Sequence, residues 1–213
     1  QLDGLRSKDL SVLSLRRLHN GTLYIGTAGN GAIVLDPVTG KAKHLSAAHG
    51  AEDLNSGDIY CITEDSKGQI WFGTNGDGVI ALKNNNGLVR YTPNPTGPDD
   101  ILLPINGYIR AIEEDGRGNI WIGSHGGGLT VYDPHTGKFT VHNQSNSPLP
   151  SDKIHALLRD SRGLMWIGTY GGGLSVFDER TEKFTNFSEK DGLQNTTIYQ
   201  LVEDNKGKLW IST

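Results

Sequence analysis

Two sets of polar and aromatic side chains could contact a small ligand, because they recur at the ends of apolar stretches on one predicted face. In the first set, each residue lies at the same position near the start of a strand: Tyr60, Arg110, His155 and Tyr199. In the second set, each residue lies in or beside a short glycine-containing turn: Asn75, Asp77, His125 and Tyr170. Phenol, imidazole, amide and charged groups together suit a sugar-like or anionic ligand. These residues form the candidate binding site, although several could instead satisfy backbone groups of their own loops.

An aspartate also recurs, and its setting argues against acid–base catalysis. Each copy stands three residues before a glycine: Asp65, Asp115, Asp160 and Asp204. Aspartate at the start of such a turn accepts hydrogen bonds from backbone N–H groups, and the glycine takes the left-handed conformation. A carboxylate repeated in this way caps a turn, so the sequence predicts no catalytic residue.

The sequence predicts no metal and no cofactor. The seven histidines are scattered, and none could be paired with another at a metal-ligand spacing. The glycine runs 126–128 and 171–173 resemble phosphate-binding loops only superficially, because each leads into a strand and not into a helix. We expect them to form turns that need positive φ angles and close backbone packing.

These candidate residues belong to a repeat that is centred on an aromatic side chain. The aromatic positions follow one another at intervals of 44 to 50 residues: Tyr24, Trp71, Trp121, Trp166 and Trp210. A period in this range is typical of stacked or radial repeats. The indoles lie in mid-strand with apolar neighbours, so we expect them to pack between adjacent repeats. An exposed platform for carbohydrate is the less favoured alternative.

Each repeat is predicted to form four short strands. Around Trp121 these strands cover residues 109–115, 119–124, 129–133 and 138–142, and turns separate them. Short strands at this spacing are typical of one propeller blade, and no segment keeps the 3.6-residue period of a helix. The predicted fold class is therefore all-β, a β-propeller of four-stranded antiparallel blades with almost no helix.

About four and a half blades are predicted, in a single partial β-propeller over residues 1–213. The blade repeats cover approximately 11–45, 59–91, 109–142 and 154–187, followed by an incomplete repeat at 198–213. Propellers remove their lateral edges by closing into a ring. We therefore expect the open faces to be covered by further blades of a longer propeller, or by another chain.

Composition excludes several classes of partner. The net charge is −4, and the 20 basic and 24 acidic residues are well mixed, so nucleic acid is not an expected partner. No apolar run approaches the about 18 residues of a membrane helix, so no membrane segment is expected in this chain. The single cysteine, Cys61, cannot form an internal disulfide and leaves the compartment undecided.

The position of the binding face follows from the direction of the chain. In an antiparallel blade, the loop between the second and third strands emerges on the same face as the connection to the next blade. These connections differ from one another: Ser46–Asp58, Thr92–Tyr108, Asn143–Lys153 and Ser188–Thr197. Variable loops on a rigid scaffold commonly build binding sites, so this face is the predicted location of the ligand.

Residues 115–133 and 160–178 resemble the two-component regulator propeller repeat, with the pattern Asp-x-x-Gly-x-Ile-Trp-Ile-Gly-Thr-x-Gly-Gly-Gly-Leu-x-x-Phe/Tyr-Asp. Residues 65–82 follow it less closely, because Asp77 interrupts the glycines. The first repeat departs most, with Tyr24 in the tryptophan position, and Ser212 replaces a glycine in the last one.

This resemblance implies a sensor. Members of the family form seven-bladed propellers in the extracytoplasmic part of hybrid histidine-kinase regulators, where they sense glycan breakdown products and signal with the help of dimerisation. For this chain it implies a non-enzymatic ligand-sensing module in the periplasm. The implied partners are an oligosaccharide or other small molecule, the rest of the sensor kinase, and a second copy in a homodimer.

Two other classes of function stay open at this point. A propeller enzyme acting on polysaccharide, either a lyase or a glycoside hydrolase, would need paired carboxylates in a pocket. Acidic residues do lie in loops of the candidate face, but the sequence brings no pair of them together: Glu52, Asp53, Asp99 and Asp100. A protein-interaction propeller would instead present a large exposed apolar patch on that face.

Overall fold

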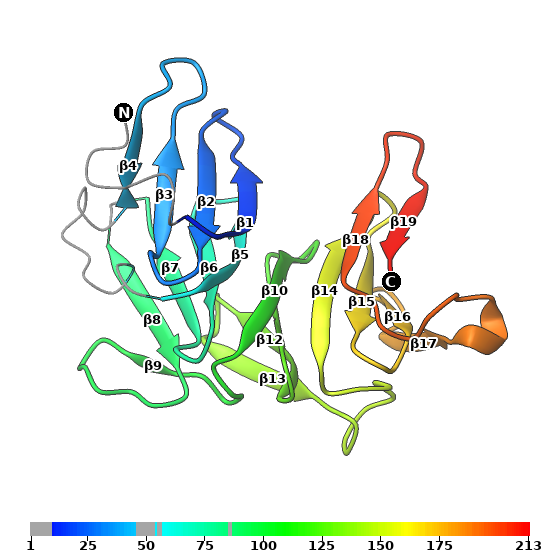
Figure 1. The fold of residues 1–213 in the computed structure, drawn as a ribbon. Helices are drawn as coiled ribbons and strands as arrows, with labels where there is room; N and C mark the ends of the chain where they lie inside the picture. Colours follow the sequence, from blue (N-terminus) through cyan, green and yellow to red (C-terminus); the bar gives the residue numbers. More distant parts are fainter. Residues whose placement is uncertain (1–9, 46–53, 55–56, 85–86) are drawn as a thin grey trace. The chain divides into compact units, whose positions relative to one another are not determined.

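The computed structural model describes residues 10–45, 54, 57–84 and 87–213. It consists of antiparallel sheets of short strands, with a short 3-10 helix, η2 (Glu189–Asp191), in the second half of the chain (Figure 1). The predicted all-β class and the four-stranded antiparallel blade are confirmed. The chain divides into two compact units, residues 1–103 and 104–213.

The first unit contains two sheets with strand orders β1-β2-β3-β4 and β5-β6-β7-β8-β9 (Figure 1). The strands are β1 (Val12–Arg17), β2 (Leu23–Thr27), β3 (Ala32–Leu35), β4 (Ala42–His44), β5 (Ile59–Glu64), β6 (Ile70–Thr74), β7 (Val79–Leu82), β8 (Leu88–Thr92) and β9 (Ile101–Leu102). The first strands of the two sheets, β1 and β5, are neighbours. Consecutive blades contact each other in this way around a propeller axis.

Strand β9 was not predicted from the sequence, which indicated a variable connection there. It adds a fifth, parallel strand to the edge of β8. The preceding loop is closed by Asp100, whose Oδ2 accepts hydrogen bonds from the N–H groups of Thr96 and Gly97 at 2.9 and 2.8 Å. Two residues are too few to show the alternation from which a strand is predicted.

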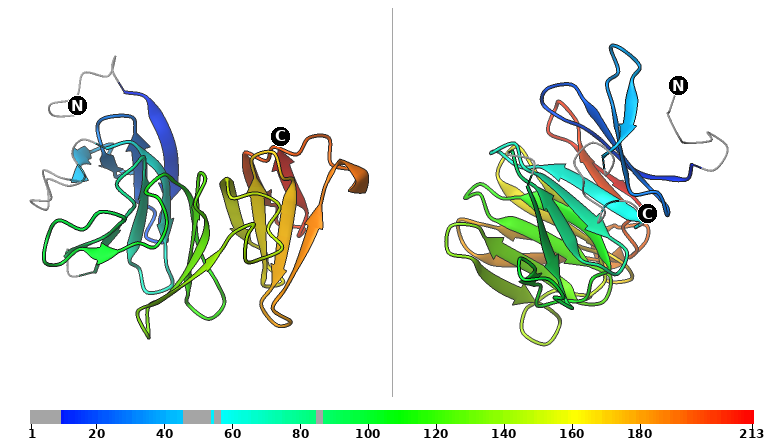
Figure 2. Two further views of the ribbon diagram at one scale, coloured as in Figure 1. Left: turned by 90° about the horizontal axis from the view of Figure 1, so that it is seen from below. Right: turned by 90° about the vertical axis from the view of Figure 1, so that its left-hand side faces the viewer.

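The second unit contains two four-stranded sheets and one two-stranded sheet. The strands are β10 (Ile109–Glu114), β11 (Ile120–Ser124), β12 (Gly128–Asp133), β13 (Lys138–His142), β14 (Ile154–Arg159), β15 (Leu164–Thr169), β16 (Leu174–Asp178), β17 (Lys183–Phe187), β18 (Gln200–Glu203) and β19 (Leu209–Ser212). Strand β14 lies beside β10 on one side and β18 on the other (Figures 1 and 2). The first strands of the three sheets thus lie in a row, with β14 in the middle.

The repeated tryptophans differ in how far they are buried. Trp71 and Trp121 are only 2% exposed. Trp121 packs on Phe177 of the next sheet, with ring centroids 5.1 Å apart, as predicted. Trp166 is half-buried, whereas Trp210 is 62% exposed. The expectation that every indole packs between blades is therefore wrong for Trp210, because no described residue covers that side of the two-stranded β18–β19 sheet.

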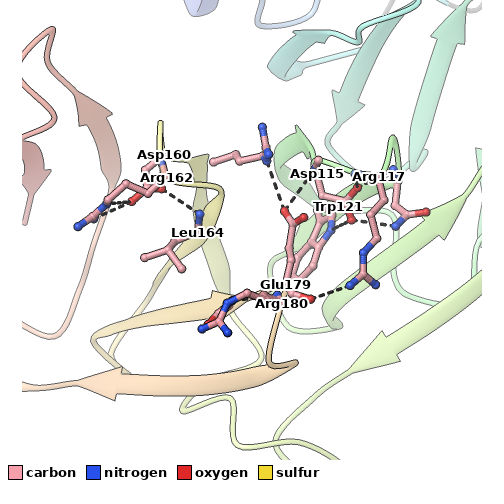
Figure 3. Close-up of polar contacts among 12 residues, drawn as sticks. Asp115, Arg117, Trp121, Asp160, Arg162, Leu164, Glu179 and Arg180 are labelled. Atoms are coloured by element: carbon pink, nitrogen blue, oxygen red, sulfur yellow. Dashed lines mark hydrogen bonds and ion pairs between the residues drawn. The ribbon is translucent and has the colours of Figure 1, made fainter.

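The recurrent aspartates cap turns, as predicted, and they also bind the tryptophan side chains. Asp115 Oδ1 accepts hydrogen bonds from the backbone N–H groups of Arg117 and Asn119 at 2.9 and 2.8 Å. Its Oδ2 accepts a hydrogen bond from Trp121 Nε1 at 3.0 Å (Figure 3). The same bond recurs at 2.9, 2.9 and 3.0 Å between Asp65 and Trp71, Asp160 and Trp166, and Asp204 and Trp210.

The first sheet lacks both members of this pair. Leu18 takes the place of the aspartate, because its N–H closes the same turn by donating to Thr22 O. Tyr24 takes the place of the tryptophan. Both side chains are buried in the same apolar cluster, so apolar packing takes the place of the hydrogen-bonded pair in this repeat.

Within each unit, neighbouring sheets interlock where an isoleucine at or just before a first strand meets a glycine of the preceding second strand. A Cβ on Gly26 would lie 2.8 Å from Ile59 Cγ2. The corresponding distances are 2.6 Å between Gly123 and Ile154, and 2.7 Å between Gly168 and Ile198. In the last sheet this position holds a side chain, Ser212, and no described residue sits over it in the way that the isoleucines do.

Polar contacts add a second link between the β10–β13 and β14–β17 sheets, at the end with the aspartate turns. Glu179 Oε1 accepts hydrogen bonds from Gly116 N at 3.3 Å and Arg159 Nε at 3.4 Å. The backbone carbonyl of Glu179 accepts another from Arg117 Nη2 at 2.7 Å (Figure 3). These contacts fix the two sheets to each other at the end away from the predicted binding face.

Candidate functional site

A β-bulge recurs in the first strand of each four- or five-stranded sheet, and three of the predicted site residues occupy it. The pairing with the second strand skips one residue in β1, β5, β10 and β14. The skipped residues are Leu13, Tyr60, Arg110 and His155. A bulge leaves its extra residue out of the hydrogen-bonded ladder and redirects its side chain. The local backbone therefore explains why this repeat position can carry such different residues.

The turns after β11 and β15 bring two more predicted residues to the same end of the second unit. His125 forms a bridge with Lys153, and Tyr170 N donates to Lys153 O at 2.8 Å. Gly126 and Gly128 have φ angles of 100° and 81°, as predicted for this turn, and both N–H groups donate to Asp152 O at 2.9 Å. The connection before β14 is thereby tied to the turn of the preceding sheet.

Four predicted residues converge in the second unit into what we call the His–Tyr cluster: His125, His155, Tyr170 and Tyr199. His125 Nδ1 lies 3.0 Å from His155 Nε2, within hydrogen-bond distance. The Tyr170 ring lies 6.0 Å from the His125 ring and 5.3 Å from the His155 ring, between centroids. The Tyr199 ring lies 6.0 Å from that of His155. Both tyrosines are exposed, at 44% and 56%, so the cluster faces solvent.

Cationic side chains surround this cluster. Lys153 Nζ lies 5.4 Å from the centroid of the Tyr170 ring. The pKa of His125 is lowered by burial, then by the charges of Arg110 and Lys153. The pKa of His155 is lowered by burial, then by His125, Arg110 and Lys153. Both imidazoles therefore tend to be neutral near pH 7, with one ring donating an N–H to the other.

In the first unit, three predicted residues take other contacts. Asn75 Nδ2 donates to Asp58 Oδ2 at 3.1 Å, and Asp58 Oδ1 accepts from Gly29 N at 2.8 Å. Asp77 is exposed, and its N–H donates to Thr74 Oγ1 at 3.1 Å. Tyr60 is half-buried in the bulge of β5. The first unit thus presents an amide bound to a carboxylate where the second presents imidazoles and phenols.

Sequence reasoning placed His125 and His155 on one face but did not predict their contact, and it missed Lys153 and Asp58. The contact joins residues 30 positions apart through two adjacent sheets. Lys153 and Asp58 each stand directly before the repeated isoleucine of a first strand. That shared position is the sequence signal that would have found them.

Among the described residues, no group of three histidine, cysteine, aspartate or glutamate side chains comes together as a metal site requires. The described chain also contains no helix with the length and apolar character needed to cross a membrane.

The pattern described as two component regulator propeller matches four segments of the chain, residues 53–76, 103–126, 148–171 and 192–213. Each segment contains the first strand of one sheet, the aspartate turn that follows it and one tryptophan. The chain belongs to the two-component regulator propeller family. The predicted family is confirmed, and the first sheet of this regulator propeller, with Leu18 and Tyr24, lies outside the matched segments.

A solved structure similar to this regulator propeller is the extracellular domain of a proposed hybrid two component system from B. thetaiotaomicron. The two share 28% sequence identity with a TM-score of 0.78, over 95% of this chain and 26% of that chain. A second such extracellular domain from the same organism has 22% identity and a TM-score of 0.60, over 95% of this chain and 34% of that chain. The regulator propeller therefore spans about a quarter to a third of the length of these relatives.

The fold is also shared with virginiamycin B lyase from Staphylococcus aureus. The TM-score is 0.70 at 16% identity, over 96% of this chain and 64% of the lyase. Likeness at this identity concerns the fold alone. No curated protein matches the sequence of the regulator propeller.

Proposed function

We propose that this regulator propeller is a non-enzymatic, ligand-sensing module of a bacterial two-component receptor, located outside the cytoplasm in the periplasm. Its ligand is an oligosaccharide derived from a glycan, and its partners are the rest of the sensor kinase and a second copy in a homodimer. The similarity to extracellular domains of proposed hybrid two component systems supports this setting.

The single observation that carries the proposal is the His–Tyr cluster. Two exposed phenol rings stand beside two imidazoles, on turns and bulges that the sheets hold in place. Aromatic rings offer apolar faces to the C–H groups of a sugar, and the nearby polar atoms can bind its hydroxyl groups. All four residues lie at bulge or turn positions of the repeat, so the cluster forms without a change in the strands of the sheets.

The enzyme alternative has less support. Glycoside hydrolysis needs two carboxyl groups that flank the scissile bond, whereas the His–Tyr cluster consists of imidazoles and phenols. Of the acidic residues considered from the sequence, Glu52 and Asp53 lie outside the described residues. Asp100 binds backbone N–H groups in its own loop, and these bonds lower its pKa. Its role is therefore to close the loop.

Thermal shift and calorimetry with a panel of oligosaccharides would test the proposal. We expect at least one oligosaccharide to bind, and Tyr170→Ala and Tyr199→Ala each to weaken that binding about 3- to 10-fold. His135→Ala is the matched control, because His135 is an exposed histidine in the turn between β12 and β13, which emerges at the opposite end of the sheet. Binding that both tyrosine variants retain in full, or turnover of the oligosaccharide, would contradict the proposal.

A further inference from the structure

Two cationic side chains act on the imidazoles of the His–Tyr cluster. Arg110 from the bulge of β10 and Lys153 from the connection before β14 both act on the imidazoles as cations. The rings that face the pair are the phenols of Tyr170 and Tyr199. The Asp152 carboxylate, next in sequence to Lys153, accepts a hydrogen bond at Oδ1 from Gln144 N at 2.7 Å.

The histidine pair adds a proton-dependent charge to this setting. At a separation of 3.0 Å, one ring nitrogen donates its hydrogen to the other. If both nitrogens carried a hydrogen, the two N–H groups would point at each other, so the pair in this geometry accepts at most one further proton. Lys153 and Arg110 oppose that proton as long as no negative charge lies between them and the pair.

We infer that the ligand of the His–Tyr cluster carries an oxyanion, as a carboxylate or sulfate group on a sugar ring, and that its binding brings one proton onto the His125–His155 pair. This inference rests on the proposed binding site and names the chemical class of its ligand. An oxyanion seated among Arg110, Lys153 and the two imidazoles neutralises the cations that otherwise keep the pair uncharged. The negative charge of the ligand is thus stabilised by the cations and by the protonated pair, and it in turn stabilises the proton on the pair.

The direction of the pH dependence follows from this coupling. The oxyanion binds the protonated pair more tightly than the neutral pair, so binding raises the pKa of the pair. Affinity is therefore highest at low pH and falls as the pH rises through the pKa of the free pair, by at most about tenfold per pH unit for one linked proton. A neutral ligand would show no such slope.

Inorganic sulfate is a suitable probe, because it presents an oxyanion without a sugar. We would titrate the full 213-residue chain with sodium sulfate against sodium chloride at matched ionic strength, and follow the imidazole resonances by NMR. We expect the dissociation constant of sulfate, read from His125 and His155, to be about tenfold lower at pH 5.5 than at pH 7.5. His→Gln variants assign the resonances.

Two variants separate a built site from general salt effects. Lys153→Gln removes one cation from an exposed side chain and should weaken sulfate binding at both pH values, while Lys138→Gln, an exposed lysine at the far end of β13, should leave it unchanged. The inference is overturned if sulfate shifts His135 as much as the pair, or if its affinity is the same at both pH values.

The identity of the sugar is tested separately. Digalacturonate and galactose 6-sulfate are compared with neutral galactobiose, and proton uptake is measured by calorimetry in buffers of different ionisation enthalpy. Uptake with either acidic ligand supports the inference, and the stronger of the two identifies the oxyanion as carboxylate or sulfate. If a neutral oligosaccharide binds at the cluster without proton uptake, the inference fails while the proposed sensing function stands. If sulfate binds the pair but no oligosaccharide does, the sensing function fails and the anion site remains.

Discussion

An aspartate and a tryptophan six residues apart stabilise the repeat at the residue scale. The hydrogen bonds to Asp160 change the pKa of its carboxyl group. Burial alone would raise the pKa of this carboxyl, but hydrogen bonds from Trp166, Leu164 and Arg162 lower it overall. The buried carboxylate is thus kept ionised by its hydrogen-bond donors. The first repeat has no buried carboxylate at this position, because Leu18 and Tyr24 replace the aspartate and the tryptophan.

Exchanging both members together should cost less than the sum of the single changes. Asp115→Leu leaves the buried Nε1 of Trp121 without its acceptor, and should lower the free energy of unfolding by about 2–4 kcal/mol. Trp121→Tyr leaves the carboxylate short of a donor. The double variant copies the Leu18–Tyr24 pair, so we expect a favourable coupling of about 1 kcal/mol or more in urea denaturation.

The last repeat supplies the control for this cycle. Asp204 and Trp210 form the same hydrogen bond at 3.0 Å, but Trp210 is 62% exposed. Because water can replace either partner there, Asp204→Leu and Trp210→Tyr should be nearly additive. Equal coupling in the two repeats would show that burial does not set the strength of this pair.

At the scale of elements, the contact between an isoleucine and a glycine sets how closely two sheets approach. The isoleucine Cγ2 occupies the space where a side chain on the glycine would begin. A small residue is therefore required wherever another sheet follows. In β19 an exposed serine, Ser212, stands at the corresponding position.

Adding one methyl group at this contact should separate two sheets. Gly168→Ala places a Cβ 2.7 Å from Ile198 Cγ2, and overpacking of this kind costs about 1–3 kcal/mol. Thermal and urea unfolding would measure the loss. Gly57→Ala is the control, because the nearest atom to its Cβ, Asp77 Oδ2, is 4.0 Å away.

A second substitution tests the cause of that loss. Ile198→Ala removes the Cγ2 that collides, so the double variant should lose less stability than the two single variants together. A purely additive result would show that Gly168 matters for another reason, such as the backbone entropy of the strand.

Much of this architecture was predictable from the sequence, because strands such as β11 carry the alternation and β-branched residues that define them. The aspartate turns were predictable for the same local reason. The bond from Asp115 to Trp121 was not, because it depends on how the strand turns its indole back towards the loop. The contact between His125 and His155 depends on two sheets being neighbours, which no local pattern encodes.

At the scale of the whole chain, apolar side chains lie open on the first and last sheets. Val12 and Leu15 of β1 are 57% and 62% exposed, while Ile59 and Ile62, at the same positions of β5, are 1% and 6% exposed. Val202 and Trp210 of the last sheet are 50% and 62% exposed. Exposed apolar surface of this kind marks sites of association.

We therefore expect the isolated chain to self-associate. Its mass-average molecular weight in sedimentation should rise with protein concentration, and Leu15→Lys combined with Trp210→Lys should reduce that rise. Val38→Lys is the control, because Val38 is 92% exposed but lies in the turn between β3 and β4. A strictly monomeric chain at every concentration would contradict this prediction.

The bulge in the first strand of each four- or five-stranded sheet has a consequence for how such proteins diversify. Its residue differs every time, as leucine, tyrosine, arginine and histidine, while the residue before it is always valine or isoleucine and the one after it is always small. A single substitution at this position would change the side chain that is available to a ligand. The valine or isoleucine before it and the small residue after it would keep their packing. Each duplicated blade would then add one more variable position for ligand recognition while it keeps the same packing between sheets.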